Sequence, residues 1–121
     1  MKKKVLIAED DQISCEYLLE ILKPEGFEII TARNGREAIK QCEEHPGIAA
    51  VLMDIKMPEM DGEKAVSEIK KLNPKIPVIA QTAYALDEER ATILNAGFDD
   101  YLAKPIRKED LLDTIRKHTG G

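Results

Sequence analysis

Short apolar runs alternate with amphipathic helical patterns along the whole of this 121-residue chain. Each run has the length of a β-strand, and each intervening pattern gathers its apolar residues on one face of a helix. Strands that are apolar on both faces are typical of a parallel sheet covered by helices on each side. The alternation predicts strands at 4–8, 28–32, 49–53, 78–81 and 101–103, and helices at 12–23, 36–44, 63–72, 87–96 and 108–118.

The connections between these elements are short, and right-handed crossovers leave few ways to arrange five β–α units. The simplest is an α/β fold of the flavodoxin-like type. This is a (βα)₅ doubly wound, five-stranded parallel sheet with strand order 2-1-3-4-5. No repeat, internal linker or low-complexity tract divides the chain, so we expect residues 1–121 to form a single domain. In this strand order, ligands bind outside the carboxyl ends of the first and third strands.

Composition excludes several classes of function. The formal net charge is −5, so the chain lacks the basic surface expected of a protein that binds nucleic acid directly. No apolar run approaches the ~20 residues that span a bilayer, and the first run is shorter than the ~7–15 residues of a signal-peptide core. We therefore expect a cytoplasmic protein with no membrane contact. Cys15 and Cys42 lack metal-site spacing and are interpreted as small buried hydrophobes.

Polar side chains stand where the predicted strands end. The third apolar run ends on Asp54, and a buried carboxylate is costly unless another group pairs with it. The first strand ends in Glu9 and Asp10, the fourth in Thr82 and the fifth in Lys104. Because the carboxyl ends of parallel strands meet at one edge of a sheet, we expect these five side chains to lie together.

Such a group of side chains suits phosphoryl chemistry. Three neighbouring acids repel one another unless a cation lies between them, and their oxygens suit a hard ion such as Mg²⁺. No histidine or cysteine accompanies them, which argues against zinc. Lys104 and Thr82 can hold phosphoryl oxygens. With those oxygens held, a carboxylate such as Asp54 can act as a nucleophile and form an acyl phosphate.

Four segments, "LIAEDD", "VLMDIKMPEMDG", "PVIAQTA" and "DDYLAKP", resemble the motifs of the response-regulator receiver domain. This family is the phosphoacceptor module of two-component and phosphorelay signalling, and the resemblance covers the whole chain. It implies that Asp54 is the phosphorylation site and that the protein catalyses only its own phosphorylation and dephosphorylation. It implies that Thr82 and Lys104 are catalytic contacts to the phosphoryl group. It also implies a Mg²⁺ site formed by Glu9, Asp10, Asp54 and the main-chain carbonyl of Lys56. Thr82 and Tyr101 are the implied switch residues.

The resemblance also implies partners. A histidine kinase or phosphotransfer protein is expected to dock over the start of the first helix and the loop after the fifth strand, near Ser14, Tyr17 and Ile106. Tyr17 is equally compatible with a core position. The face made by the fourth helix, fifth strand and fifth helix is the expected output surface. A homodimer on phosphorylation is also expected. A cis peptide bond is expected before Pro105.

Two variable positions beside the phosphoryl site are Lys56 and Tyr84. Neither side chain orients water well, so we expect slow self-dephosphorylation. The segments "MDIKMPEMDG" and "AQTAYA" resemble receivers of hybrid histidine kinases more than receivers fused to DNA-binding domains. Both a single-domain regulator and a receiver from a larger protein fit the sequence.

Other readings fit less well. An aspartyl-phosphate phosphohydrolase of the haloacid-dehalogenase type wants an acid two residues after its nucleophile, where this chain has Lys56. A flavodoxin-like FMN site needs a glycine- and hydroxyl-rich loop in place of "EDDQ", and no P-loop motif is present. A degenerate receiver that acts only as a binding module is disfavoured by the complete set of acids, threonine and lysine.

Overall fold

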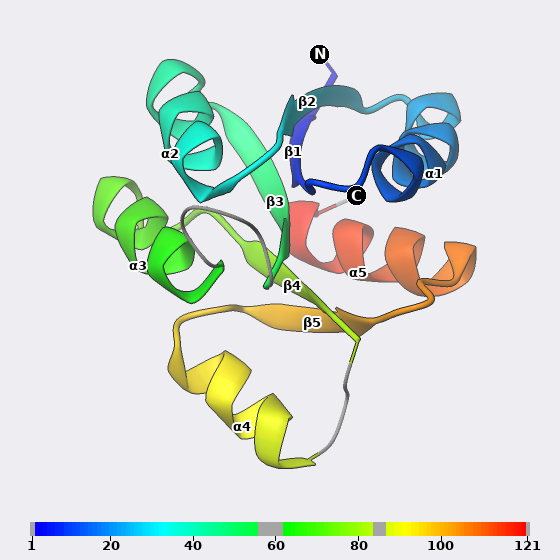
Figure 1. Cartoon of the computed structure of the whole chain (residues 1–121). Helices are drawn as coiled ribbons and strands as arrows, with labels where there is room; N and C mark the ends of the chain where they lie inside the picture. Colours follow the sequence, from blue (N-terminus) through cyan, green and yellow to red (C-terminus); the bar gives the residue numbers. More distant parts are fainter. Residues whose placement is uncertain (1, 56–61, 84–86, 121) are drawn as a thin grey trace.

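The sheet has five parallel strands in the order β2-β1-β3-β4-β5, with helices on both faces (Figure 1). This computed structural model describes residues 2–55, 62–83 and 87–120. The predicted fold class and strand order are confirmed. The elements are β1 (Lys4–Ala8), α1 (Gln12–Leu22), η1 (Lys23–Glu25), β2 (Glu28–Ala32), α2 (Gly35–Glu44), β3 (Ile48–Asp54), α3 (Gly62–Leu72), β4 (Val78–Thr82), α4 (Asp87–Asn95), β5 (Asp100–Ala103) and α5 (Lys108–Thr119).

Most bounds agree with the sequence prediction within one residue or two, and two of the differences have a clear cause. The first helix ends at Leu22 rather than Lys23, and a 3₁₀ turn, η1, follows it. Pro24 has no N–H to continue the α-helical ladder, and Gly26 leaves the turn with a φ of 93°. The third strand runs on to include Asp54, which lies beside Gln81 of β4 in the parallel register. The strand therefore presents Asp54 from a regular, hydrogen-bonded backbone.

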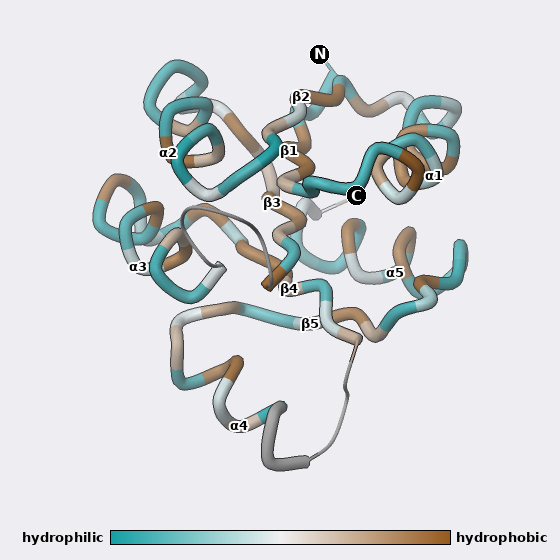
Figure 2. The backbone as a smooth tube through the Cα atoms, in the orientation of Figure 1, coloured by the Kyte–Doolittle hydropathy of each residue, from teal (hydrophilic) through white to brown (hydrophobic). Residues whose placement is uncertain are grey.

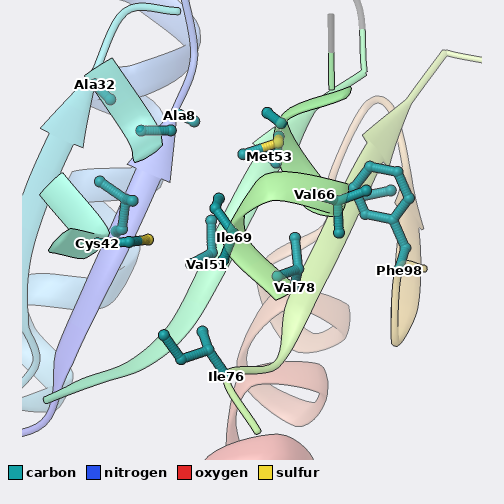
Figure 3. Packing of buried hydrophobic residues seen from close by; sticks show 14 of the residues in the cluster. Ala8, Ala32, Cys42, Val51, Met53, Val66, Ile69, Ile76, Val78 and Phe98 are labelled. Carbon is teal, nitrogen blue, oxygen red and sulfur yellow. The ribbon is translucent and has the colours of Figure 1, made fainter. Parts of the chain in front are cut away.

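Alternate strand residues pack into two apolar layers, one on each face of the sheet. The helices α1 and α5 cover one face through residues such as Leu18 and Leu111, and α2 and α3 cover the other through residues such as Ala38 and Ile69. Figure 1 shows the two helix pairs on opposite sides of the strands, and Figure 2 shows brown strands between helices that are teal on their outer sides. Side chains of the α2–α3 layer, including Ile69 and Val51, meet over β3 in Figure 3.

The edge of the sheet where the strands begin is clamped by one lysine. Lys70, near the end of α3, donates hydrogen bonds to the carbonyl of Ile76 at 2.7 Å and to the Asp99 carboxylate at 2.6 Å. The same Asp99 oxygen accepts from the Val78 backbone N–H at 2.8 Å, and the Asp99 N–H donates to the Val78 carbonyl at 2.9 Å. These contacts join the end of α3 to the starts of β4 and β5.

The described parts of the chain contain no helix that is both long enough and apolar enough to cross a membrane. Both cysteines are free thiols. Cys42 is buried, as the sequence indicated, but Cys15 is only half-buried. Its position on α1 lies at the margin of the layer between α1 and the sheet, which corrects the expectation that both thiols are buried.

Candidate functional site

Polar residues from four strands converge at the carboxyl edge of the sheet, as the sequence predicted. Glu9 follows β1, Asp54 ends β3, Thr82 ends β4 and Lys104 follows β5. Three of these side chains are buried, with residue exposures of 3% for Glu9, 7% for Asp54 and 6% for Thr82. Burial at this depth means that each charged group must find a partner within the site.

The Lys104 ammonium bridges two carboxylates. Its Nζ donates to Asp54 Oδ2 at 3.0 Å and lies 3.4 Å from Glu9 Oε2. Burial opposes the charged form of this lysine, but the hydrogen bonds and charges of Asp54 and Glu9 together outweigh burial, and the pKa of Lys104 lies above the ordinary value. Lys104 therefore remains a cation and supplies the positive charge that Asp54 requires at the end of an apolar strand.

The ionised form of Glu9 is disfavoured in this site. Burial, followed by the charge of Asp54, raises the pKa of Glu9 to about 7. The backbone N–H of Asp11 donates to Glu9 Oε1 at 3.2 Å and offsets part of this penalty. The site thus holds more negative charge than Lys104 alone can balance.

Three acids could hold a metal ion. Carboxylate oxygens of Glu9, Asp10 and Asp54 all lie within 4.8 Å of one another. Asp10 is exposed and faces solvent, while the other two are buried. Three hard oxygen donors in a partly open cluster suit a cation such as Mg²⁺, which keeps some of its water ligands. Lys56, whose carbonyl the resemblance adds to this set, lies outside the described residues, as does Tyr84.

The start of α1 is fixed beside the acids by an N-cap. The Asp11 carboxylate accepts from the backbone N–H of Ser14 at 3.0 Å and from its hydroxyl at 2.6 Å. This confirms Asp11 as the cap predicted from the sequence. The cap holds the chain in an extended conformation at residue 11, so that Glu9 and Asp10 leave β1 toward the acidic cluster.

The opposite wall of the site is tied to β5. The Lys104 backbone N–H donates to the Thr82 carbonyl at 2.7 Å, which continues the β4–β5 pairing up to the site. The Lys104–Pro105 peptide bond is cis, as expected. Tyr101, the second residue of β5, pairs with Ala80 of β4, is half-buried, and packs against the apolar layer that includes Ile93 and Phe98.

Gly62 is a residue whose role the sequence analysis did not identify. A Cβ on Gly62 would lie 2.8 Å from the Asp54 carbonyl oxygen and 2.9 Å from Ile55 Cα, both of them backbone atoms. The Gly62 N–H donates to the Ile55 carbonyl at 2.9 Å. The start of α3 therefore packs directly on the backbone that carries Asp54, and only glycine fits there.

We expect Gly62→Ala to lower the free energy of unfolding by about 1–3 kcal/mol, because the added methyl group must displace backbone. The same displacement should slow any reaction at Asp54. Urea unfolding measures the first effect. Gly47→Ala is the matched control, because a Cβ at Gly47 meets nothing within 4 Å. Equal stability of the two variants would show that the backbone beside Asp54 tolerates the contact.

A groove lies next to the site, between α1 and the segment after β5. Its volume is about 490 Å³, and its walls include Ile13, Ser14, Tyr17, Lys104 and Ile106. Tyr17 is 45% exposed, and its hydroxyl donates to the Ile106 carbonyl at 2.7 Å. Tyr17 is therefore a wall of this groove rather than a core residue, which decides between the two positions that the sequence left open.

Comparisons with known proteins agree with this geometry. Residues 5–116 match the response regulator receiver domain family. The polar-differentiation response regulator DivK of Brucella anthropi is 34% identical over 99% of this chain and 98% of its own length. The transcriptional regulatory protein ZraR of Escherichia coli K12 is 39% identical over 93% of this chain, which spans only 25% of ZraR.

Solved structures extend the likeness. The receiver domain of the sensor histidine kinase PA1611 from Pseudomonas aeruginosa PAO1, which has a magnesium ion coordinated in its active-site cleft, is 30% identical with a TM-score of 0.91 and full coverage of both chains. The receiver domain of Ssk1 from Saccharomyces cerevisiae, solved with the histidine phosphotransfer protein Ypd1, is 27% identical with a TM-score of 0.90 over 98% of this chain and 90% of that one. The chain belongs to the response regulator receiver domain family and is a receiver domain of two-component or phosphorelay signalling.

Proposed function

We propose that Asp54 accepts a phosphoryl group from a histidine kinase or a histidine phosphotransfer protein, in a step that requires Mg²⁺. The observation that carries this proposal is the position of the Lys104 ammonium, 3.0 Å from Asp54 Oδ2 at the rim of a buried acidic cluster. A lysine placed there neutralises Asp54 before the reaction and can hold a phosphoryl oxygen during it.

The acidic cluster supplies the metal ligands. Asp10 and Asp54 offer direct carboxylate ligands, Glu9 offers a third carboxylate oxygen within 4.8 Å, and the sequence resemblance adds the Lys56 carbonyl. When bound, Mg²⁺ would offset the charge on the phosphoryl oxygens and on the attacking carboxylate. The surplus of negative charge around Glu9 favours occupation of the cluster by a divalent cation.

In the transfer step, a carboxylate oxygen of Asp54 attacks the phosphorus of the donor phosphohistidine. The new P–O bond forms, the P–N bond breaks, and the bonding electron pair returns to the imidazole ring of the donor. The Lys104 ammonium stays bound to an oxygen of the phosphoryl group as it is transferred. The Thr82 hydroxyl at the end of β4 donates to another of these oxygens. The regular, hydrogen-bonded backbone of β3 at Asp54 keeps the nucleophile fixed while the donor approaches.

A direct test uses acetyl phosphate as the donor and an electrophoretic shift of the phosphorylated chain as the readout. We expect a single phosphoryl group, labile to alkali and to hydroxylamine, in Mg²⁺ buffer and none after chelation of the metal. Incorporation that is unaffected by chelation, or that resists hydroxylamine, would contradict an aspartyl phosphate formed with Mg²⁺.

We infer that the phosphodonor docks on the groove between α1 and the segment after β5. Lys104 lies both in the site and in the groove wall, so a protein seated in the groove has its reactive group close to Asp54. The groove is mostly apolar, and Ile13 on its rim is 78% exposed. An exposed isoleucine beside such a groove suits the apolar helix face of a histidine-bearing partner.

We expect Ile13→Glu to slow phosphotransfer from the phosphorylated cognate kinase while leaving labelling by acetyl phosphate unchanged, because the substitution alters the docking surface and not the site. Ser14→Glu should act in the same direction. Ile106 on the other wall is only 7% exposed, so Ile106→Glu would place a charge in the apolar layer and does not test docking alone. Leu72→Glu is the matched control, since Leu72 is 50% exposed on α3. Equal transfer rates for wild type, Ile13→Glu and Leu72→Glu would rule this surface out.

The output surface that we propose is formed by α4, β5 and α5. Attraction of Thr82 to the phosphoryl group would open space beside β5, and Tyr101 would turn into it. The half-buried position of Tyr101 supports this, since the ring borders both the core and the surface. A homodimer that forms on phosphorylation remains a prediction.

A further inference from the structure

Arg90 of α4 lies over the ring of Tyr101 in β5. The centre of its guanidinium group is 5.4 Å from the centroid of the ring. At this distance a cation is attracted to the face of an aromatic ring. Arg90 is exposed, whereas Tyr101 is half-buried against the apolar layer. The contact therefore joins a surface helix to a side chain that reaches into the core.

The described part of α4 has a small buried face. Ile93 is 3% exposed and reaches the apolar layer, whereas Leu94, the next residue, is 50% exposed. Ala91 and Thr92 are also exposed. Because residues 90–95 bury little apolar surface, and burial is the main source of helix attachment in a folded domain, this part of α4 depends also on its other contacts for its position. The Arg90–Tyr101 contact is one of these.

The other neighbour of β5 is attached in a different way. The Asp100 carboxylate accepts from the Tyr101 backbone N–H at 2.9 Å and lies 2.9 Å from His118 Nε2 and 3.6 Å from Lys117 Nζ of α5. Burial opposes the ionised form of Asp100, but the contacts with His118, the Tyr101 N–H and Lys117 together outweigh burial, and the pKa of Asp100 lies below the ordinary value. None of these contacts involves the Tyr101 ring, so they survive a rotation of that ring.

We propose that Arg90 is a positioning residue for Tyr101, which holds the ring in the orientation seen here and ties α4 to β5 through it. Rotation of Tyr101 breaks the Arg90–Tyr101 contact and weakens the attachment of α4 to β5, while Asp100 keeps α5 attached to β5. The proposal rests on the proposed function, because it assigns Arg90 to the state that precedes phosphorylation. A contact made in only one of two states shifts their ratio by its own free energy. An exposed cation–π contact corresponds to a shift of about two- to fivefold.

The test is the affinity for beryllofluoride in saturating Mg²⁺, followed by amide chemical shifts. Arg90→Ala should tighten apparent binding by about two- to fivefold, because loss of the contact removes a restraint on the unliganded state. Arg90→Lys keeps a cation near the ring and should restore most of the wild-type value. In a Tyr101→Leu background, Arg90→Ala should have no effect. Arg36→Ala is the control for loss of an arginine charge, because Arg36 is exposed on α2, which contacts β2 at the opposite edge of the sheet from β5.

Hydrogen exchange provides a second measurement. Beryllofluoride should reduce the protection of α4 amides in the wild type and leave the amides of α5 near His118 unchanged. Unchanged affinity in Arg90→Ala, an equal effect in the Tyr101→Leu background, or loss of protection in α5 rather than α4 would each overturn the role of Arg90. Failure of wild-type protein to bind beryllofluoride, or equal binding by Asp54→Asn, would instead overturn the proposed function and this inference with it.

Discussion

Replacing Asp54 with asparagine should abolish phosphorylation by acetyl phosphate and Mg²⁺ while leaving the chain folded. Asparagine has nearly the same shape as aspartate but lacks a nucleophilic carboxylate oxygen. The fold should persist, because Lys104 retains Glu9 as a partner 3.4 Å away and because removal of the Asp54 charge relieves Glu9. The phosphoryl content of the protein after reaction, measured by intact mass, reports the first expectation, and urea unfolding reports the second.

Asp113→Asn is the matched control for this substitution, because Asp113 is exposed on α5 and lies on the same chain away from the acidic cluster. It should be labelled like the wild type. Labelling of Asp54→Asn at the wild-type level would remove Asp54 from its proposed role, and labelling at a second residue would show up as a phosphopeptide that lacks residue 54.

Replacing Asp10 with alanine should remove the binding of Mg²⁺ in the absence of phosphate. The cluster offers few protein ligands, so water must complete the coordination of the metal and affinity should already be weak in the wild type. Loss of one carboxylate from such a set leaves too little to hold the ion. Acetyl phosphate labelling should fall at least about tenfold, since charge stabilisation by the metal is worth several kcal/mol. Titration of Mg²⁺ followed by amide shifts measures the binding.

Asp10 is exposed, so its replacement should change the free energy of unfolding by less than about 0.5 kcal/mol. Glu16→Ala controls for the loss of one negative charge, because Glu16 is an exposed acid on α1 that does not belong to the acidic cluster. An Mg²⁺ affinity that is the same in Asp10→Ala and in Glu16→Ala would exclude Asp10 from the metal site.

The fold could be predicted from the sequence because each element carries its own periodic signal. The β3 run from Ala49 to Met53 is apolar on both faces, which only a sheet covered on both sides can bury. The five-residue convergence at the carboxyl edge followed from topology alone, since Glu9, Asp54 and Lys104 end or follow strands that the order 2-1-3-4-5 places together. Parallel strands that all begin at one edge leave no other place for these side chains.

Contacts between different elements could not be predicted in the same way. The position of Arg90 over Tyr101 depends on how α4 packs against β5, and neither residue lies in a pattern that fixes that packing. The sequence left Tyr17 open between a surface and a core position for the same reason. Helical spacing shows which face of α1 carries Tyr17 but not which element that face contacts. The sequence pattern also gave no signal for Gly62, which is required by a close approach of backbone to backbone.

The clamp formed by Lys70 gives the two edges of the sheet different stiffness. At the edge where the strands begin, one ammonium group joins α3 to β4 and β5 through hydrogen bonds of 2.6 and 2.7 Å, and Lys70 is largely shielded from solvent. The opposite edge holds charged groups whose balance changes with the ligand. A rearrangement that starts at Asp54 should therefore swing β5 and its neighbours about the clamped edge as a pivot, so that displacements grow from Asp99 toward Lys104 instead of being uniform along the strand.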